Sequence, residues 1–209
     1  MRLQLREPPH TLPSACRICI VERRIRQCLA ILQRPGLASE LDDDARAELG
    51  QRLAERVVDA AQPYPIVVVT SAPEVRDWAQ HRGLAVLEDP GSLDGAAARG
   101  QASLAKAGLS RVVIAHADLA RARSLGRLAD DGARPVVALV PCHRDDGTNV
   151  LAIPADAPFR FAYGPGSFRR HAAEARRLAM GLRVVRDPDL AFDVDVPDDL
   201  AALAAGCAS

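Results

Sequence analysis

The chain has 209 residues, enough for one domain with a single substantial core. Its 27 Lys and Arg residues balance its 27 Asp and Glu residues, and this zero formal net charge argues against a nucleic acid or acidic membrane as partner. No apolar run approaches the roughly 20 residues of a membrane span, and no apolar block of a secretory signal follows the N-terminus, so we expect a cytoplasmic protein.

Two kinds of apolar pattern alternate along the chain from residue 42 to residue 140. Strands with helices between them indicate βαβ units, so we expect an α/β fold with a single Rossmann-like domain, in which helices flank a mixed, mainly parallel sheet. The predicted helices span residues 42–61, 73–81, 94–107 and 119–129, and the predicted strands span 66–70, 84–87, 111–116 and 135–140. Beyond residue 140 we expect strands at 150–153 and 182–185 and helices at 167–180 and 197–205.

Residues 1–36 do not follow this alternation and form a divergent N-terminal segment of the single domain 1–209. A doubly wound nucleotide-binding fold usually begins with an apolar strand and a phosphate-binding loop that carries Gly or Lys. Here the short apolar run 18–21 is followed by charged residues. This run fits a weak strand or part of an amphipathic helix, and the pattern does not decide between them.

Three carboxylates are candidates for a metal site. Asp118 follows the predicted strand 111–116, and the carboxyl ends of parallel strands open into the ligand crevice; a helix N-cap is the alternative role. Asp193 and Asp195 alternate with apolar residues, so in an extended segment both point to one face, about 7 Å apart. Two such acids could bind Mg²⁺ or lie on a solvated strand face. Asp198 and Asp199 fit the first turn of the last helix, where they would compensate the helix dipole.

Two turns are candidates for binding an anion. The stretch Gly164-Pro165-Gly166-Ser167 precedes a predicted helix, where small residues let backbone N–H groups converge on an anion and Ser167 can add its hydroxyl. Arg169 and Arg170 would lie in the first helical turn, where a bound phosphate would favour them. An ordinary Ser cap is the alternative. The stretch 145–149 (Asp-Asp-Gly-Thr-Asn) is by itself only a turn signal.

These motifs, taken in order, resemble the CofC/FbiD family of guanylyltransferases of deazaflavin coenzyme F-420 biosynthesis. The resemblance covers about residues 37–203 and implies a nucleotide-diphospho-sugar transferase (MobA-like) fold. The motifs that carry it are His116-Ala117-Asp118-Leu119, Asp146-Gly147-Thr148-Asn149, Tyr163-Gly164 with Ser167-Phe168 and His171, and Asp193-Val194-Asp195 with Pro197 and Asp199-Leu200. The stretch 90–97 (Pro-Gly-Ser-Leu-Asp-Gly-Ala-Ala) is similar to the actinobacterial branch.

The resemblance implies that GMP passes from GTP to phosphoenolpyruvate, or to 2-phospho-L-lactate, with release of pyrophosphate. It also implies site residues: Asp118, Asp193 and Asp195 would bind Mg²⁺ and carry catalysis. The phosphorylated three-carbon acid would be bound by Thr148, Gly164 and Ser167. Since the acceptor is already a nucleophilic phosphate, positioning and charge neutralisation suffice, and no general base is needed.

The chain departs from the family before residue 37. Family members carry Val-Pro-x-Lys after the first strand and then Lys-Ser-Arg-Leu, whereas Pro35 and Gly36 stand where Ser and Arg would be. Arg34 is the one candidate substitute for the Lys that contacts the nucleotide. Two alternatives therefore stay open: a related transferase with another nucleotide or acceptor, such as a molybdopterin-type cofactor, and a catalytically silent nucleotide-binding paralogue. The pattern also leaves a homodimer open.

Overall fold

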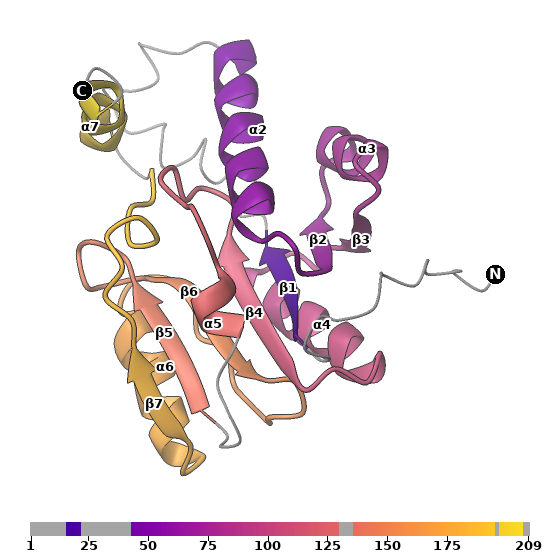
Figure 1. Cartoon of the computed structure of the whole chain (residues 1–209), viewed down its shortest axis with the longest axis vertical. Coiled ribbons are helices and arrows are strands. Elements are labelled where there is room, and N and C mark those ends of the chain that lie inside the picture. The colour runs from indigo at the N-terminus through magenta and orange to yellow at the C-terminus, as the bar shows by residue number, and fades with distance from the viewer. Residues whose placement is uncertain (1–15, 22–42, 130–135, 195–196, 207–209) are drawn as a thin grey trace, which may run out of the picture.

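A computed structural model of the chain describes residues 16–21, 43–129, 136–194 and 197–206. Strands and helices alternate in it along most of the chain (Figure 1). The strands are β1 (Cys16–Val21), β2 (Ile66–Thr70), β3 (Ala85–Glu88), β4 (Arg111–His116), β5 (Val136–Pro141), β6 (Thr148–Pro154) and β7 (Gly181–Val184). The helices are α2 (Asp43–Ala60), α3 (Pro73–His81), α4 (Leu93–Lys106), α5 (Gly126–Ala129), α6 (Ser167–Arg177) and α7 (Pro197–Gly206).

The strands form one mixed, mainly parallel sheet in the order β3-β2-β1-β4-β6-β5-β7. Strand β6 runs antiparallel to its neighbours β4 and β5, and the other pairs are parallel. The predicted α/β class is therefore confirmed. The antiparallel strand follows directly from the chain, because β5 and β6 are joined by the short segment 142–147 and not by a helix.

The undecided run 18–21 belongs to a central strand of the sheet. Strand β1 lies between β2 and β4, with Ile18 opposite Ile66 on one side and opposite Val113 on the other. Residues 1–15 and 22–36, including Arg34, lie outside the described residues. A run of only six residues, followed by a charged stretch, is too short to show a strand by period alone, and its two partner strands lie far along the chain.

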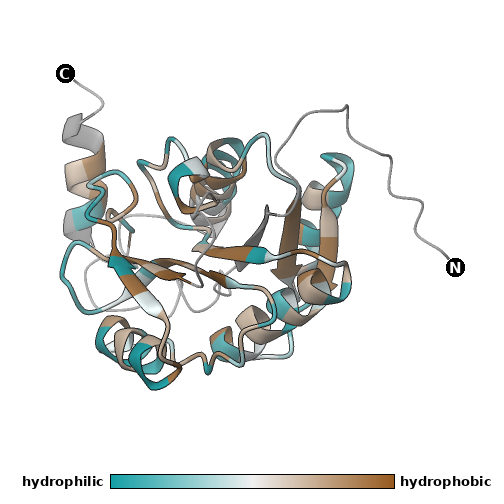
Figure 2. Ribbon diagram, turned by 60° about the horizontal axis from the view of Figure 1, so that its bottom comes forward, coloured by the Kyte–Doolittle hydropathy of each residue, from teal (hydrophilic) through white to brown (hydrophobic). Residues whose placement is uncertain are grey.

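Helices cover both faces of the sheet, and the strands alternate between the two cores. Val68 and Val113 face the core under α2, α3 and α5, whereas Val67 and Ile114 face the core under α4 and α6. Figure 2 shows the apolar strands between helices whose outer surfaces are hydrophilic. Burial on both faces explains the uninterrupted apolar runs that predicted β2 and β4 at their observed bounds.

The predicted helix 119–129 is wrong for most of its length. Only Gly126–Ala129 is helical, and Leu119 instead forms an isolated antiparallel bridge with Asp193. Leu119, Leu125 and Leu128 recur at multiples of three and are all fully buried, which imitates a helical period. Their spacing reflects a turn-rich segment whose leucines all face the core. The pairing with residue 193 decides the backbone conformation, and it is not visible locally.

One edge of the sheet collects the segments that carry the candidate residues. Parallel strands β4 and β5 end there, and antiparallel β6 begins there with Thr148. The strand order also changes direction here: β2 and β3 lie on one side of β1, whereas β4 lies on the other side. Ligands of open α/β sheets bind outside the carboxyl ends of strands at such a switch point. Among the described helices, none is long and apolar enough to cross a membrane.

Candidate active site

The fold brings two of the three candidate metal-binding carboxylates together. Asp118 lies in the turn after β4, and Asp193 lies beside it because residue 193 bridges to Leu119 and the N–H of Val194 donates to the carbonyl of Asp118 at 3.3 Å. Asp118 is 6% exposed and Asp193 is 5% exposed. A solvated strand face is therefore excluded for Asp193, and no helix begins at Leu119 for Asp118 to cap.

The other two candidates at this end of the site, Asp195 and Arg34, lie outside the described residues. Within the described ranges, no three His, Cys, Asp or Glu side chains form a group that could hold a metal ion. The donor set of Asp118 and Asp193 nevertheless fits Mg²⁺, which is commonly held in phosphoryl-transfer sites by one or two carboxylates, phosphate oxygens and water. Two buried carboxylates side by side also repel unless a cation lies between them.

A chain of polar contacts ties Asp193 to the start of α7. Nδ1 of His143 lies 3.3 Å from the Asp193 carboxylate, and Nε2 of the same ring lies 3.5 Å from Asp199. Arg144 donates to both carboxylate oxygens of Asp199, at 2.8 and 3.0 Å. Asp199 lies in the first turn of α7, as expected, but it is buried and paired with Arg144 and does not merely compensate a helix dipole.

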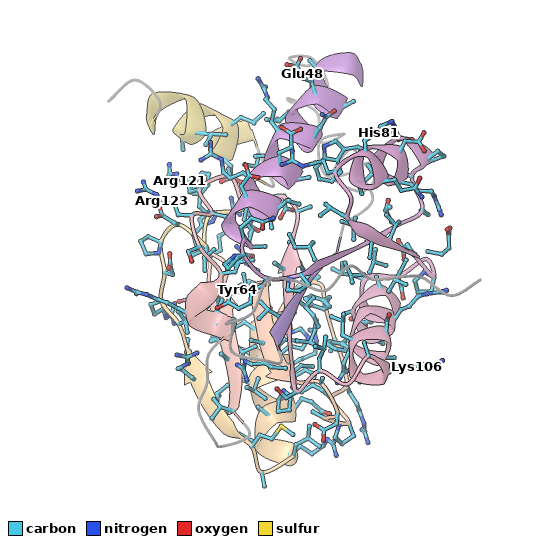
Figure 3. The ribbon with its side chains drawn as sticks, turned by 45° about the vertical axis from the view of Figure 1, so that its right-hand side comes forward. Glu48, Tyr64, His81, Lys106, Arg121 and Arg123 are labelled. Carbon is cyan, nitrogen blue, oxygen red and sulfur yellow. The ribbon has the colours of Figure 1, made fainter. Side chains whose placement is uncertain are left out.

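Aromatic stacking holds the segment before Asp193 in place. Phe192 packs between the His143 ring, at 5.5 Å between centroids, and the Arg121 guanidinium, at 3.9 Å from its ring centre. Arg121 also donates to the carbonyl of Ala202 in α7 at 3.3 Å. Figure 3 shows Arg121 beside Arg123 and below α7. A cation over an aromatic ring contributes about 0.5 to 2 kcal/mol, less where it is exposed, so this stack stabilises the position of the Asp193 backbone.

The candidate acceptor residues lie together where β6 begins beside α6. Thr148 and Ser167 are each 1% exposed, and the Ser167 hydroxyl donates to Oγ1 of Thr148 at 3.4 Å. Nδ1 of His171, one turn further along α6, lies 3.0 Å from the same oxygen. Because Thr148 Oγ1 accepts from these neighbours, its own hydroxyl hydrogen can be donated to a further group such as an anion.

His171 is held in one neutral tautomer. The N–H of Ala162 donates to its Nε2 at 3.0 Å, so the ring proton must be on Nδ1, which donates to Thr148. Burial lowers the pKa of His171 from 6.5 to about 4, and the charge of Arg170 lowers it too, against a smaller opposing effect of Glu174. The ring is therefore uncharged at neutral pH and serves as a fixed hydrogen-bond donor to Thr148.

The glycine-rich turn 164–167 presents fewer free N–H groups than the sequence predicted. The carboxylate of Asp146 accepts from the N–H of Gly166 at 2.9 Å, and its backbone carbonyl accepts from Phe168 at 3.1 Å. The N–H of Ser167 donates to the carbonyl of Gly164 at 3.0 Å. An acidic residue of this chain thus already occupies much of the N-terminal end of α6, and an anion cannot be held there by several converging N–H groups.

One backbone donor of the turn is still available. The N–H of Tyr163 donates to the carboxylate of Asp94 at 2.6 Å, and Pro165 has no N–H. Within the part of the chain that the structure describes, the N–H of Gly164 donates to no residue. Gly164 has a φ of 98°, a conformation that side-chain-bearing residues rarely adopt. The donors available to an anion are therefore this N–H and the hydroxyl of Thr148, because the Ser167 hydroxyl already donates to Thr148.

Aromatic rings connect the acceptor residues with the carboxylates. The Tyr163 ring lies edge-on to His171, at 4.8 Å between centroids, and 5.2 Å from the ring of His116. His116 is the last residue of β4, two positions before Asp118. The hydroxyl-lined site and the carboxylate pair are thus parts of one region at the sheet edge.

The comparison with known families identifies the chain. The guanylyl transferase CofC-like family model matches residues 30–206. The chain belongs to this family. Two relatives are both named phosphoenolpyruvate guanylyltransferase. That of Sphaerobacter thermophilus is 34% identical over 175 residues, 80% of this chain and 84% of the relative. That of Roseiflexus castenholzii is 37% identical over 173 residues, 80% of each chain.

Solved structures agree with the fold of the CofC-like family. A putative nucleotide-diphospho-sugar transferase from Desulfovibrio desulfuricans G20 superposes with a TM-score of 0.65 at 14% identity, covering 90% of this chain and 85% of that one. The predicted resemblance to CofC and the nucleotide-diphospho-sugar transferase fold are therefore both confirmed. At this identity the structural likeness supports the fold alone.

The sequence did not indicate the roles of three residues that shape the site: His143, Asp146 and Arg170. Arg170 was expected near a bound phosphate, and the structure shows it on the carbonyls of its own loop. Asp146 was noted as part of a turn signal and of a family motif but was given no role, and its partner Gly166 is 20 positions away. His143 follows β5 directly, and the carboxyl end of a parallel strand is a general signal that could have singled it out. For Arg170 no local signal distinguishes a side chain that faces a ligand from one that folds back on its own loop.

Proposed function

We propose that this CofC-like protein transfers GMP from GTP to phosphoenolpyruvate, releasing pyrophosphate, in the cytoplasm. The observation that supports this most is the buried pair Asp118 and Asp193, joined at the switch-point edge of the sheet, beside a site with two hydroxyls and one N–H donor. The names of the two relatives give the reaction class and the acceptor. The nearest alternative acceptor is another phosphorylated three-carbon acid, 2-phospho-L-lactate. With either acceptor, we propose that the product enters the biosynthesis of a deazaflavin coenzyme.

The reaction needs no base from the protein. A phosphate oxygen of the acceptor forms a bond to the α-phosphorus of GTP, the bond from that phosphorus to the β-bridging oxygen breaks, and pyrophosphate leaves with the electron pair. What the chain must supply is orientation of the acceptor phosphate and stabilisation of charge on the α-phosphate. Thr148 and the Gly164 N–H would orient the acceptor, each through a hydrogen bond to an anion, worth about 1.5 to 3 kcal/mol. Ser167 would add a third such bond when its hydroxyl turns from Thr148 to the acceptor.

Asp118 and Asp193, together with Asp195, would hold a Mg²⁺ ion. Bound there, the ion would neutralise negative charge that develops on the α-phosphate and on the leaving pyrophosphate. The contacts of His143 with Asp193 and Asp199 would keep the Asp193 carboxylate in one orientation, as outer partners of metal ligands do. Activity should therefore be abolished by a chelator and restored by Mg²⁺.

Arg34 would contact the phosphates of GTP in place of the family's Lys. Replacing Arg34 with Met should then raise the KM for GTP by about tenfold or more, as expected for the loss of a charge-assisted contact, and leave the KM for the acceptor unchanged. The homodimer also remains a prediction, and the molar mass in solution by light scattering would test it.

A mass-spectrometric screen tests the function directly. The purified chain is incubated with Mg²⁺, one of GTP, ATP or CTP, and one of phosphoenolpyruvate, 2-phospho-L-lactate or a molybdopterin-type phosphate. We expect a guanosine diphosphate-linked product from GTP and phosphoenolpyruvate. Turnover with another nucleotide or only with the cofactor phosphate would replace the proposed substrates, and binding of GTP without turnover would indicate a silent paralogue.

A further inference from the structure

The side chain of Arg170 is surrounded by the carbonyls of four successive residues. Its Nε and Nη2 donate to Ala162 at 3.1 and 2.9 Å, Nη2 also to Tyr163 at 3.2 Å and to Gly164 at 3.4 Å, and Nη1 to Pro165 at 2.6 Å. A guanidinium has five N–H donors in a fixed planar arrangement, so it can hold several carbonyls in one orientation. Arg170 therefore folds back on its own loop and does not extend toward a phosphate.

Fixing these carbonyls also fixes the N–H groups between them. In a trans peptide the C=O and the following N–H point in opposite directions. Because the Tyr163 carbonyl points to Arg170, the N–H of Gly164 in the same peptide points away from Arg170. The neighbouring donors are engaged by Asp94 and Asp146, so the N–H of Gly164 is the one that an anion can use.

The absence of a side chain at Gly166 leaves room for the guanidinium of Arg170. Gly166 has a φ of 74°, and a Cβ at this position would lie 3.1 Å from Nη1 of Arg170. Any side chain at position 166 would therefore press on the guanidinium as well as strain the backbone. The two glycines of the turn have different roles: Gly164 presents a donor, and Gly166 leaves room for Arg170.

We infer that Arg170 is a positioning residue of the acceptor site, which turns the carbonyls of residues 162–165 away from the phosphorylated acid and the N–H of Gly164 toward it. The inference rests on the proposed function for the identity of the acid. Without the guanidinium the same peptides are free to rotate, and a carbonyl turned toward the phosphate would repel it. Arg170 acts on acceptor binding through the peptide and makes no contact with the nucleotide.

The test compares Arg170→Met with the matched control Arg169→Met. Arg169 is the preceding residue of α6, is exposed, and loses the same charge and number of donors. We expect Arg170→Met to raise the KM for phosphoenolpyruvate about tenfold or more, as for loss of one hydrogen bond to an anion, with the KM for GTP and kcat within about twofold of the unmodified protein. Arg170→Lys should be intermediate, since an ammonium reaches fewer carbonyls.

A second readout does not depend on turnover. In ¹⁵N-labelled protein, titration with phosphoenolpyruvate should shift the Gly164 amide resonance, and in Arg170→Met the same shift should require about tenfold more ligand. Circular dichroism melts establish that each variant folds. If Arg170→Met does not fold, Arg170→Lys and Gly166→Ala are measured in the same way.

The outcomes separate this inference from the proposed function. Turnover of the unmodified protein with an unchanged acceptor KM in the folded Arg170 variants would overturn the inference and leave the function standing. Equal rises for Arg169→Met, or parallel rises in both KM values, would show a general charge or folding effect and would also overturn it. If the unmodified protein transfers no GMP, the function fails, and a Gly164 amide that does not respond to phosphoenolpyruvate then overturns the inference too.

Discussion

Neutral, buried His171 should make the stability of the protein depend on pH in a defined window. In the unfolded chain its pKa returns to 6.5, whereas burial and the charge of Arg170 hold it at about 4 in the folded state. Between these values the unfolded chain binds the proton and the folded chain does not. The contribution of neutral His171 to the free energy of unfolding is therefore fully present above pH 6.5. It decreases as the pH falls and is lost completely below about pH 4.

The size of the effect follows from the same two values. A pKa lowered from 6.5 to about 4 corresponds to about 3 kcal/mol in total, of which about 2 kcal/mol is lost between pH 7.5 and pH 5. An Asn at position 171 can still donate to Thr148 but does not titrate. We therefore expect the unfolding free energy of the unmodified protein to fall by about 2 kcal/mol more over this interval than that of His171→Asn.

Urea unfolding at both pH values, followed by circular dichroism, measures this difference. An exposed histidine provides the control: His81 lies at the end of α3 and is labelled in Figure 3, and His81→Asn should preserve the full pH dependence. Equal pH dependence in His171→Asn and the unmodified protein would show that His171 is charged or exposed in the folded state. The argument for a fixed Nδ1 donor to Thr148 would then be refuted.

Other residues lead to further predictions. Asp118→Asn, Asp193→Asn and Asp195→Asn should each lower kcat about a hundredfold or more while the circular dichroism spectrum shows an intact fold. Asp198→Asn should be mild, and equal losses of kcat at Asp198 and Asp195 would contradict the assignment of the metal-binding residues. Thr148→Val and Ser167→Ala should raise the KM for phosphoenolpyruvate about tenfold or more and leave that for GTP unchanged, and an effect on GTP alone would show that the two phosphate sites are exchanged. Asp199→Asn should destabilise the fold by about 1 to 3 kcal/mol in urea unfolding and also lower kcat through His143 and Asp193; stability equal to that of the unmodified protein would remove the role of the Arg144 pair.

Much of the fold could be predicted because its signals are local. Apolar runs buried on both faces predicted 66–70 and 111–116 as strands, and Pro73 marked the start of α3. The ordered motifs around Asp118, Thr148 and Ser167 were enough to indicate the family, since each is a short contiguous stretch. Period and motif depend only on neighbouring residues, so a sequence displays them without knowledge of the fold.

Tertiary contacts decided what local pattern could not. Leucines at multiples of three predicted a helix after Asp118, but the bridge between Leu119 and Asp193 joins segments more than seventy residues apart and makes the backbone extended there. The run 18–21 became a strand only through β2 and β4, which supply its hydrogen-bond partners.

The candidate acceptor site shows the same division at the level of single hydrogen bonds. The sequence alone showed a glycine-rich turn before a helix and therefore a place where N–H groups could meet an anion. The tertiary structure decided which of them remain available, because Asp94 and Asp146, from distant parts of the chain, accept two and Arg170 turns a third outward. A backbone N–H that donates to a side chain is not available to a ligand, and its partner is set by three-dimensional proximity, which the order of residues in the chain does not contain.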